Sequence, residues 1–510
     1  MKKCSSVKDI AAIQCVNNAG YDVLQRKTAY GIKATFAQLL ATMVQSLLLV
    51  NVGMELSICT IVIGSLYKNP NAEFHLSVTN SSWYGSILYL CQPFGSCLSG
   101  YLQVTYGKKF CSVVACVPSI IGWIILSYSN SVPMLYLSTL TMGIGLGFTD
   151  GPAYSYIGEI SEPRLRGIMA CVINMACLIG MLATYGLGSI FHWRTVAMLS
   201  TLCPLMCLIF IAFIPESPIW LLSKNKNEKA MDAICWLRGW VDPCVVSTEY
   251  QELMFYYKTS VEQKKVVNNN TGLFSSFSWL KSSSVYRPLR LTTMYYIITL
   301  ISCLTTCRPY IMEMMKESGV KDSQSIALVL FGSMQLAGSL MLTFTIQKLG
   351  KRLLTIMTLS INIISIFLFA LYIMGIRRGI IMPKACIPII IYSVIMFSGA
   401  MGVLTVPWTL VSEVYPNEAK GFASSLTTSI FYILTFLGTK VFLNVQNALG
   451  LYNTFFMFGA LSFAGLIYLY NYLPETANKT LLEIEEFFVP EREKQTTIES
   501  KPSKHRYGDL

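Results

Sequence analysis

Long apolar stretches dominate the sequence and predict helices that cross a membrane. A helix needs about 20 apolar residues to span the roughly 30 Å hydrocarbon core of a bilayer. About twelve such stretches occur: Phe36–Ser65, Trp83–Val104, Phe110–Ser127, Pro133–Ile157, Ile168–Ile190, Thr195–Ile214, Leu291–Met312, Ser325–Ile346, Leu353–Gly375, Ile387–Val411, Phe422–Val445 and Tyr452–Leu473. The first is too long and too far from Met1 for a cleaved signal peptide. The pattern therefore predicts an all-α polytopic membrane protein with 12 transmembrane helices.

One long polar segment, from about Pro215 to Pro288, divides these stretches into two sets of six. The sequence therefore predicts five parts. They are a tail at 1–35, a six-helix bundle at 36–214, a linker with short helices at 215–289, a second six-helix bundle at 290–473 and a tail at 474–510.

Three short motifs recur at matching places in the two sets and indicate an internal repeat. They follow the second, fourth and sixth span of each set. The pairs are Gly107-Lys108-Lys109 with Gly350-Lys351-Arg352, Glu159 to Gly167 with Glu413 to Gly421, and Pro215-Glu216-Ser217 with Pro474-Glu475-Thr476. Repeated six-helix halves with a substrate site between them at the middle of the membrane are typical of secondary transporters.

Charge is sparse and unevenly placed. Charged residues make up 13% of the chain, whereas a soluble domain has about 25%, and the net charge is +12. Basic residues gather in alternate connections, such as those at Lys108, Arg164 and Lys351. The positive-inside rule places these connections, the linker and both termini in the cytosol. Short basic loops do not favour nucleic acid binding, so a lipid bilayer and a small solute are the predicted partners.

The sequence shows no pattern typical of an enzyme or a metal site. Most of the 16 cysteines lie in predicted spans, where a thiol behaves as a small apolar group. There is no zinc-binding spacing and the chain has three histidines, so we predict no metal, no cofactor and no enzymatic activity. The sequon at Asn80 is predicted to lie outside and to be glycosylated, whereas those at Asn269 and Asn478 lie on the cytosolic side.

Several motifs resemble those of the sugar porter family of the major facilitator superfamily. They are Gly158–Gly167, Pro215–Leu221, Pro407-Trp408, and Pro474-Glu475-Thr476 followed by Lys479-Thr480-Leu481. Trp236–Gly239 and Thr439-Lys440 resemble the insect facilitated trehalose transporters within that family. The resemblance implies the major facilitator fold and a monomer in the plasma membrane. It also implies movement of a sugar of the trehalose or hexose class by facilitated diffusion through alternating access.

The same resemblance implies that charges at the cytosolic helix ends form an inner gate, which holds the halves together while the cavity faces outward. The candidates are Glu159, Arg166, Glu216, Glu413, Lys420, Glu475, Lys108, Lys109, Lys351 and Arg352. Ordinary solubilising loop charge is the alternative interpretation. The family's acid before each loop glycine is Val104 or Gln347 here, and Lys420 replaces an arginine, so we expect a looser inner gate.

The resemblance also implies a solute site, where this chain departs from the family pattern. Candidate binding residues are Asn174, Thr299, Thr305, Arg308, Gln335, Trp408 and Tyr432, with Tyr310 as an outer gate. Thr299, Leu300 and Thr305 stand where the family has amides, so we expect a different solute or weak sugar binding. Alternatively, Asn174 and Gln335 join neighbouring helices, and Trp408 serves packing.

Glu55, Asp150 and Arg308 are charged residues within otherwise apolar stretches. A charge at the centre of a membrane helix costs about 2.5–3.5 kcal/mol on insertion scales, so it usually faces a cavity or a partner. We hypothesise that Arg308 pairs with Glu55 or Asp150 across the cavity; the alternative is that it extends to the outer surface. Glu55 stands where proton-coupled porters have an aspartate, although their fourth-span arginine is Thr139 here.

Three functions stay open on the sequence alone. They are a facilitative sugar carrier, a proton-coupled sugar symporter that uses Glu55, and a non-transporting sugar sensor that has lost the seventh-span amides. The cytosolic tail of about 37 residues after Leu473 is short for a signalling domain, which disfavours the sensor.

Overall fold

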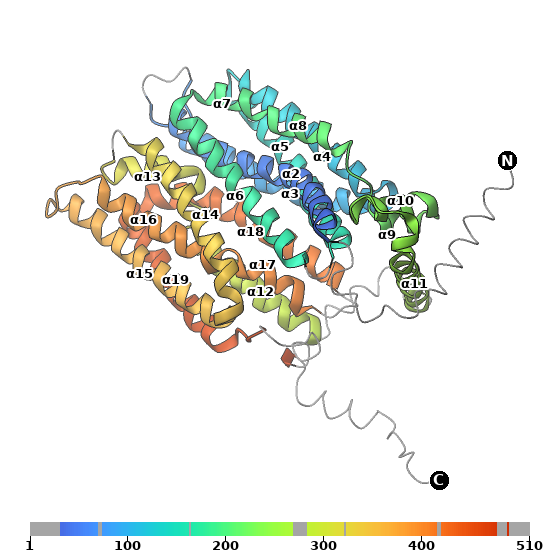
Figure 1. Cartoon of the computed structure of the whole chain (residues 1–510). Coiled ribbons are helices and arrows are strands. Elements are labelled where there is room, and N and C mark those ends of the chain that lie inside the picture. Colours follow the sequence, from blue (N-terminus) through green and yellow to red (C-terminus); the bar gives the residue numbers. More distant parts are fainter. Residues whose placement is uncertain are drawn as a thin grey trace, which may run out of the picture.

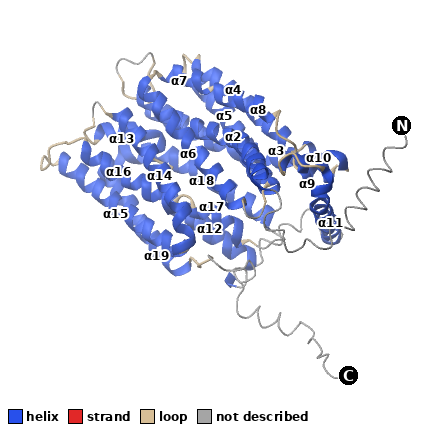
Figure 2. Cartoon of the chain, viewed as in Figure 1, coloured by secondary structure: helices blue, strands red, loops and turns tan. Residues whose placement is uncertain are grey.

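The structure is a computed structural model that describes residues 31–69, 74–162, 165–268, 283–320, 323–415, 420–476 and 487–488. These residues form helices joined by loops, and their only strand-like pairing is an isolated bridge between Tyr67 and Leu76 (Figure 2). The predicted all-α class is confirmed. The sequons at Asn269 and Asn478 and most of the two predicted tails lie outside the described residues.

Seven helices, which we call the N-terminal group, cover the first six predicted spans. They are α2 (Gly31–Leu66), α3 (Val78–Tyr106), α4 (Lys108–Ser127), α5 (Val132–Ile160), α6 (Arg166–Ile190), α7 (Trp193–Ser200) and α8 (Leu202–Ile211). The last two share one span, because Pro204 lacks an N–H and its ring would clash with the carbonyl group of Ser200 in a continuous helix. Within the group α2 packs on α6, and α3 and α4 pack on α5.

Residues 215–268 of the predicted linker form α9 (Pro218–Ser223), α10 (Asn227–Leu237) and α11 (Pro243–Asn268). Ser217 caps α9 by accepting a hydrogen bond from the backbone N–H of Trp220 at 3.4 Å, and Pro218 occupies the first helical position. The indole N–H of Trp220 donates to the carbonyl oxygen of Val104 at 3.1 Å. The linker helices therefore lie against the end of the N-terminal group that holds Val104.

The remaining helices, which we call the C-terminal group, cover the other six predicted spans. They are α12 (Ser283–Ile301), η5 (Arg308–Tyr310), α13 (Ile311–Glu317), α14 (Gln324–Leu349), α15 (Lys351–Arg377), α16 (Cys386–Ser398), η6 (Gly399–Val403), α17 (Val406–Val414), α18 (Lys420–Leu449) and α19 (Leu451–Tyr472). The seventh and tenth predicted spans are each interrupted near a proline, Pro309 and Pro407.

Pro407 leaves the carbonyl oxygen of Val403 without its helical partner. The hydroxyl group of Thr299 donates a hydrogen bond to this oxygen at 3.0 Å. A side chain of α12 therefore stabilises the break in the tenth span, where an unpaired buried carbonyl would be costly.

Ten of the described helices are long and apolar enough to cross a membrane. The two predicted spans outside this set are Trp83–Val104, which lies within the more polar helix α3, and Leu291–Met312, which is interrupted between α12 and η5. The predicted membrane fold is confirmed. The predicted count of twelve transmembrane helices requires that these two segments also cross the membrane.

Glycines allow close packing between helices. A Cβ atom added to Gly53 would lie 1.9 Å from the carbonyl oxygen of Cys177, and one added to Gly180 would lie 2.0 Å from that of Val50. A Cβ atom on Gly147 would lie 2.3 Å from the carbonyl oxygen of Gln92. Helices α2 and α6, and likewise α3 and α5, can therefore approach so closely only because these positions lack a side chain.

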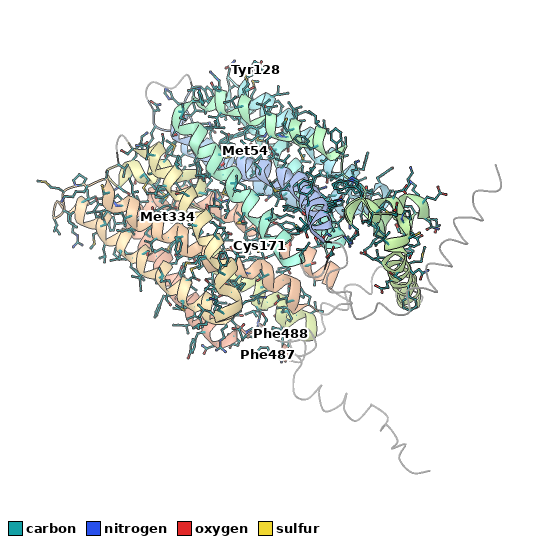
Figure 3. The ribbon with its side chains drawn as sticks, in the orientation of Figure 1. Met54, Tyr128, Cys171, Met334, Phe487 and Phe488 are labelled. Carbon is teal, nitrogen blue, oxygen red and sulfur yellow. The ribbon has the colours of Figure 1, made fainter. Side chains whose placement is uncertain are left out.

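The two groups lie side by side, with the N-terminal group in blue to green and the C-terminal group in yellow to red (Figure 1). Figure 3 places Tyr128 and Phe488 toward opposite ends of the helical body. Following the predicted topology, we call the Tyr128 end outer and the Phe488 end inner. Contacts between the groups join α3 to α18, α6 to α14, and α2 to η5 and α13.

Candidate functional site

The outer ends of the two groups are in direct contact. The hydroxyl of Thr60 donates to the carbonyl oxygen of Arg308 at 2.9 Å, and that of Ser82 donates to the carbonyl oxygen of Lys440 at 2.9 Å. A Cβ atom on Gly85 would lie 3.1 Å from the side chain of Pro309. We call this contact the outer seal. Its residues are Thr60, Ser82 and Gly85 from the N-terminal group and Arg308, Pro309 and Lys440 from the C-terminal group.

An ion pair and a cation–π contact reinforce the outer seal. Lys68 follows α2, and its Nζ atom lies 3.1 Å from a carboxylate oxygen of Glu313 and 3.6 Å from one of Glu317, both on α13. Burial alone would lower the pKa of Lys68, but the hydrogen bond and charge of Glu313 outweigh it and raise that pKa. The ammonium group of Lys440 lies 3.8 Å from the ring centroid of Trp83. Both contacts join the two groups.

Tyr310, the predicted outer gate, lies beside the seal and is fully buried. Its hydroxyl donates to the carbonyl oxygen of Thr439 at 3.0 Å, and its ring stacks on Phe442 with centroids 5.5 Å apart. Both partners belong to α18, so in this structure Tyr310 holds η5 in place within the C-terminal group.

A chain of aromatic and polar side chains crosses between the groups below the seal. The Tyr432 hydroxyl of α18 donates a hydrogen bond to the carboxylate of Asp150 on α5. One turn along α5, the Tyr154 hydroxyl donates to the side-chain oxygen of Asn174 on α6 at 3.1 Å. On the other side, the rings of Tyr432 and Trp408 are 6.5 Å apart. Predicted site residues from both groups are thus brought together, and we call this set the crossing chain.

The crossing chain is partly open. Trp408 is 36% exposed and Tyr154 is 45% exposed, and both lie toward the inner ends of their spans. Trp408 packs against Tyr296 and Phe431, with ring centroids 5.5 Å and 5.0 Å away. Aromatic neighbours therefore cover part of the tryptophan and leave about a third of its surface exposed.

The other predicted binding residues are buried. The Thr299 hydroxyl donates its hydrogen bond to the carbonyl oxygen of Val403. Thr305 and Gln335 are 4% and 3% exposed, and the Thr305 hydroxyl and the Gln335 amide nitrogen form no hydrogen bond with any described residue. Arg308 is 5% exposed. The polar groups of these three residues are therefore shielded from solvent.

The hypothesised pairing of Arg308 with Glu55 or Asp150 is wrong for this structure. The Glu55 carboxylate accepts a hydrogen bond from Asn51 at 2.9 Å, and Asn51 accepts one from the indole N–H of Trp123 at 2.9 Å. Asp150 is engaged by Tyr432 instead. Glu55 is fully buried inside the N-terminal group, and its second carboxylate oxygen forms no hydrogen bond with a described residue.

The predicted inner-gate residues pair within each group rather than between groups. Lys108 forms an ion pair with Glu159, and Lys351 forms the equivalent one with Glu413. At the start of α4, the carboxylate of Glu216 accepts hydrogen bonds from the backbone N–H groups of Lys108 and Lys109, at 3.2 and 3.1 Å. Glu475 does the same at the start of α15, accepting from Lys351 and Arg352 at 3.0 Å.

This matching geometry agrees with the internal repeat expected from the sequence. A carboxylate at a helix N-terminus satisfies unpaired N–H groups and complements the helix dipole. The side chains of Arg166 and Lys420 lie outside the described residues. Among the described inner-gate residues, these ion pairs and hydrogen bonds all lie within one half of the chain, so they do not join the two halves in this structure.

Asn80, the predicted glycosylation site, lies in the first turn of α3. Its side-chain oxygen accepts a hydrogen bond from the Tyr136 hydroxyl at 3.3 Å. Among the described residues, no group of histidine, cysteine, aspartate and glutamate side chains could hold a metal ion.

Comparison with known families decides what this architecture belongs to. The family model described as "Sugar (and other) transporter" matches residues 24–488. The chain belongs to this family. The chain is 25% identical over 457 residues to a facilitated trehalose transporter Tret1 of Culex quinquefasciatus, which covers 89% of the chain and 86% of the relative. It is 26% identical over 474 residues to the solute carrier family 2, facilitated glucose transporter member 6, of Mus musculus. This match covers 89% of the chain and 90% of the relative.

Solved structures support the same fold for this sugar transporter family member. The inward-open conformation of the xylose transporter XylE from E. coli matches with a TM-score of 0.71 at 17% identity, covering 88% of this chain and 99% of that one. The proton:xylose symporter XylE bound to 6-bromo-6-deoxy-D-glucose matches with a TM-score of 0.68 at 18% identity, covering 89% of this chain and 100% of that one. The expected major facilitator fold is confirmed. The named relatives are transporters, which agrees with the prediction that the chain is not an enzyme.

Sequence reasoning missed three residues of the outer end, namely Lys68, Glu313 and Lys440. One signal could have found Lys68 and Lys440. Basic residues are scarce in connections on the outer side of a membrane protein, so a lysine close to an outer helix end calls for a specific partner.

Proposed function

We propose that this member of the sugar transporter family carries a sugar or a sugar-derived solute across the plasma membrane by facilitated diffusion. The observation that carries the proposal is the crossing chain, which links Trp408 and Tyr432 of one group to Asp150 and Asn174 of the other. Aromatic faces beside hydroxyl, amide and carboxylate groups suit a ligand rich in hydroxyls. The named relatives include facilitated trehalose and glucose transporters, which supports this class of solute.

Alternating access between the two groups is the proposed mechanism. The outer seal joins the groups, whereas the described inner-gate ion pairs stay within one group, as expected of a carrier that faces the cytosol. Opening to the outside would break Lys68–Glu313 and Ser82–Lys440, and the inner charges would then exchange partners across the groups. The Lys68 side chain is half exposed, and an ion pair at the protein surface contributes about 0.2–1 kcal/mol, so this contact can be broken in every cycle. In this proposal the protein is a monomer with both termini in the cytosol.

Proton coupling through Glu55 is the second candidate, favoured by the carboxylate oxygen that lacks a hydrogen bond. Glu55 lies within the N-terminal group, bound to Asn51, and no residue of the crossing chain is its hydrogen-bond partner. Facilitated diffusion is therefore preferred.

Uptake of radiolabelled hexoses and disaccharides into oocytes, at neutral and acidic external pH, tests these candidates. We expect uptake that does not depend on pH and that falls about tenfold or more in Trp408→Ala. Trp240→Ala, which changes an exposed tryptophan of the linker, is the matched control and should transport normally. Acid-stimulated uptake that is lost in Glu55→Gln but kept in Glu55→Asp would establish the symporter instead. Absence of uptake despite surface expression would favour a sensor.

A further inference from the structure

Arg308 is a buried cation that the proposed sugar site does not explain. Its side chain is 5% exposed, and within the part of the chain that the structure describes it forms no ion pair with a carboxylate. The two acids of the neighbouring spans already have other partners, because Glu55 is bound by Asn51 and Asp150 by Tyr432. A buried charge is costly unless it is paired. An anion that binds beside Arg308 would supply the missing charge.

The surroundings of Arg308 are rich in hydrogen-bond donors. Its guanidinium lies beside the hydroxyl group of Tyr89 on α3. It also interacts electrostatically with Tyr185 on α6 and Tyr392 on α16. These tyrosines come from both groups, so the guanidinium lies at the junction between them.

Two further donors near this region have no partner within the described part of the chain. Thr305 is one turn before Arg308, and its hydroxyl forms no hydrogen bond with a described residue. The amide nitrogen of Gln335 likewise forms no hydrogen bond with any residue that the structure describes. Gln335 lies one turn after Phe331, whose ring is 4.9 Å from that of Tyr392, so it is on the side of α14 that faces the same cluster. Donor groups thus gather here in the absence of a described carboxylate.

We propose that the solute carried by this protein is an anion, a sugar acid or similar hydroxy acid whose carboxylate binds Arg308. This inference rests on the proposed carrier function and names the class of solute. A guanidinium group binds a carboxylate through two parallel hydrogen bonds, and the unpaired Gln335 and Thr305 donors suit neighbouring oxygens. Hydroxyl groups of the same solute would face the aromatic residues of the crossing chain. The backbone of Arg308 belongs to the outer seal, so opening of the seal would give the solute access to its side chain.

Matched pairs of neutral and anionic solutes test the proposal on the unmodified protein. D-glucose and D-glucuronate differ by a carboxylate in place of a hydroxymethyl group, and D-galactose with D-galacturonate, and glycerol with glycerate, provide two further pairs. Binding is measured as ligand-induced thermal stabilisation of the purified full-length chain, and uptake is measured in proteoliposomes. We expect a preference for the anion in at least one pair. An anion carried alone moves charge, so its uptake should also rise with an inside-positive membrane potential.

Variants of Arg308 connect this preference to the side chain. Arg308→Met keeps the length and loses the charge, so the affinity for the preferred anion should fall about tenfold to a hundredfold. Arg308→Lys keeps the charge without the planar fork and should retain part of the affinity. The loss of affinity should be larger for the anion than for the neutral member of the same pair, and melting temperatures without solute report whether both variants are folded.

The outcomes separate this inference from the carrier function. If neutral solutes are transported and the anions of all three pairs are refused, the carrier function stands and the anion inference is overturned. Equal binding of both members in every pair, unchanged in Arg308→Met, also overturns it. If no solute of any pair enters the proteoliposomes or stabilises the protein, the proposed function itself fails, and the anion inference fails with it.

Discussion

Lys68 and Glu313 lie 245 positions apart in the sequence and form a 3.1 Å ion pair that joins the outer ends of the two helix groups. The Glu313 side chain is only 7% exposed, whereas that of Lys68 is 49% exposed. The pair therefore has one end inside the protein and one in water. Such a contact stabilises the closed outer end and can still be broken when the carrier opens.

Replacement of Lys68 by glutamine should shift the protein toward an outward-open state. The change removes about 1 kcal/mol of ion-pair energy and leaves Glu313 without its charge partner, which corresponds to a shift of about fivefold in the equilibrium. Cys59 is buried beneath the seal and reports this opening. In cells treated with a membrane-impermeant maleimide, Cys59 should be protected in the unmodified protein and labelled in Lys68→Gln.

Two other cysteines control that experiment. Cys386 is exposed at the start of α16, which the predicted topology places outside, and should be labelled in both proteins. Cys244 is exposed in the linker and should stay unlabelled, because the linker is predicted to be cytosolic. Equal protection of Cys59 in both proteins would mean that this ion pair does not control the outer end. Labelling of Cys244 would contradict the topology.

Removal of the hydroxyl group in Tyr432→Phe should impair transport. The phenylalanine ring can keep the contact with Trp408, but Asp150 loses its hydrogen-bond donor from the other group. Loss of a hydrogen bond to a buried charged group costs about 1.5–3 kcal/mol, so we expect uptake to fall at least tenfold.

A double-mutant cycle with Asp150→Asn shows whether the two residues act together. If they do, the double variant should be no worse than the poorer single variant, because the second change removes an interaction that is already lost. Additive losses would show that Asp150 and Tyr432 contribute independently, which would weaken the role assigned to the crossing chain.

Thr299 and Thr305 provide a comparison within one span. Both are buried threonines, but among the described residues only the Thr299 hydroxyl has a hydrogen-bond partner. Thr299→Val leaves the carbonyl oxygen of Val403 unpaired and should destabilise the protein by about 1–3 kcal/mol. Thr305→Val removes a hydroxyl group without a described partner and should leave the stability unchanged or slightly higher. Melting temperatures of the purified variants, with Thr299→Ser as a variant that keeps the hydroxyl, measure the difference. A similar loss in both valine variants would contradict the assigned role of Thr299.

The sequence predicted the fold well because the bilayer sets the length of each helix. The apolar stretch Leu353–Gly375 lies within α15, and Tyr452–Leu473 matches α19 except for its last residue. The helix interruption near Pro407 follows from the missing N–H. The interruption of the seventh span after Ile301 was less predictable, because it precedes Pro309 by several residues and depends on contacts with other helices.

The sequence predicted which residues belong to the site, but not which of them pair with one another. Glu159 and Lys108 are both among the charges predicted at the inner end, yet which lysine an acid meets depends on the relative position of the two groups. The sequence repeats the same charges in both halves, so pairing within a half and pairing between halves are equally consistent with it. Pairs such as Lys68 with Glu313 depend in the same way on which end of the protein is closed.

Glu216 should make the stability of the inner end depend on pH. Burial raises the pKa of its carboxyl group, although the backbone N–H groups of Ser217, Lys109 and Lys108 and the charge of Lys108 partly oppose this. A carboxyl group with a raised pKa binds its proton more tightly in the folded protein than in the unfolded chain. Its contribution therefore stabilises the fold at low pH and is lost as the pH rises from the unfolded value of 4.5 through the raised folded value.

Glu216→Gln should remove this dependence, because the amide is always neutral and still offers one oxygen to the N–H groups of α4. Melting temperatures of the purified protein measured from acidic to neutral pH should fall less steeply in Glu216→Gln than in the unmodified protein. Glu228→Gln, which changes an exposed glutamate on α10, is the control and should leave the slope unchanged. An identical slope in all three proteins would show that Glu216 does not couple protonation to the stability of the inner end.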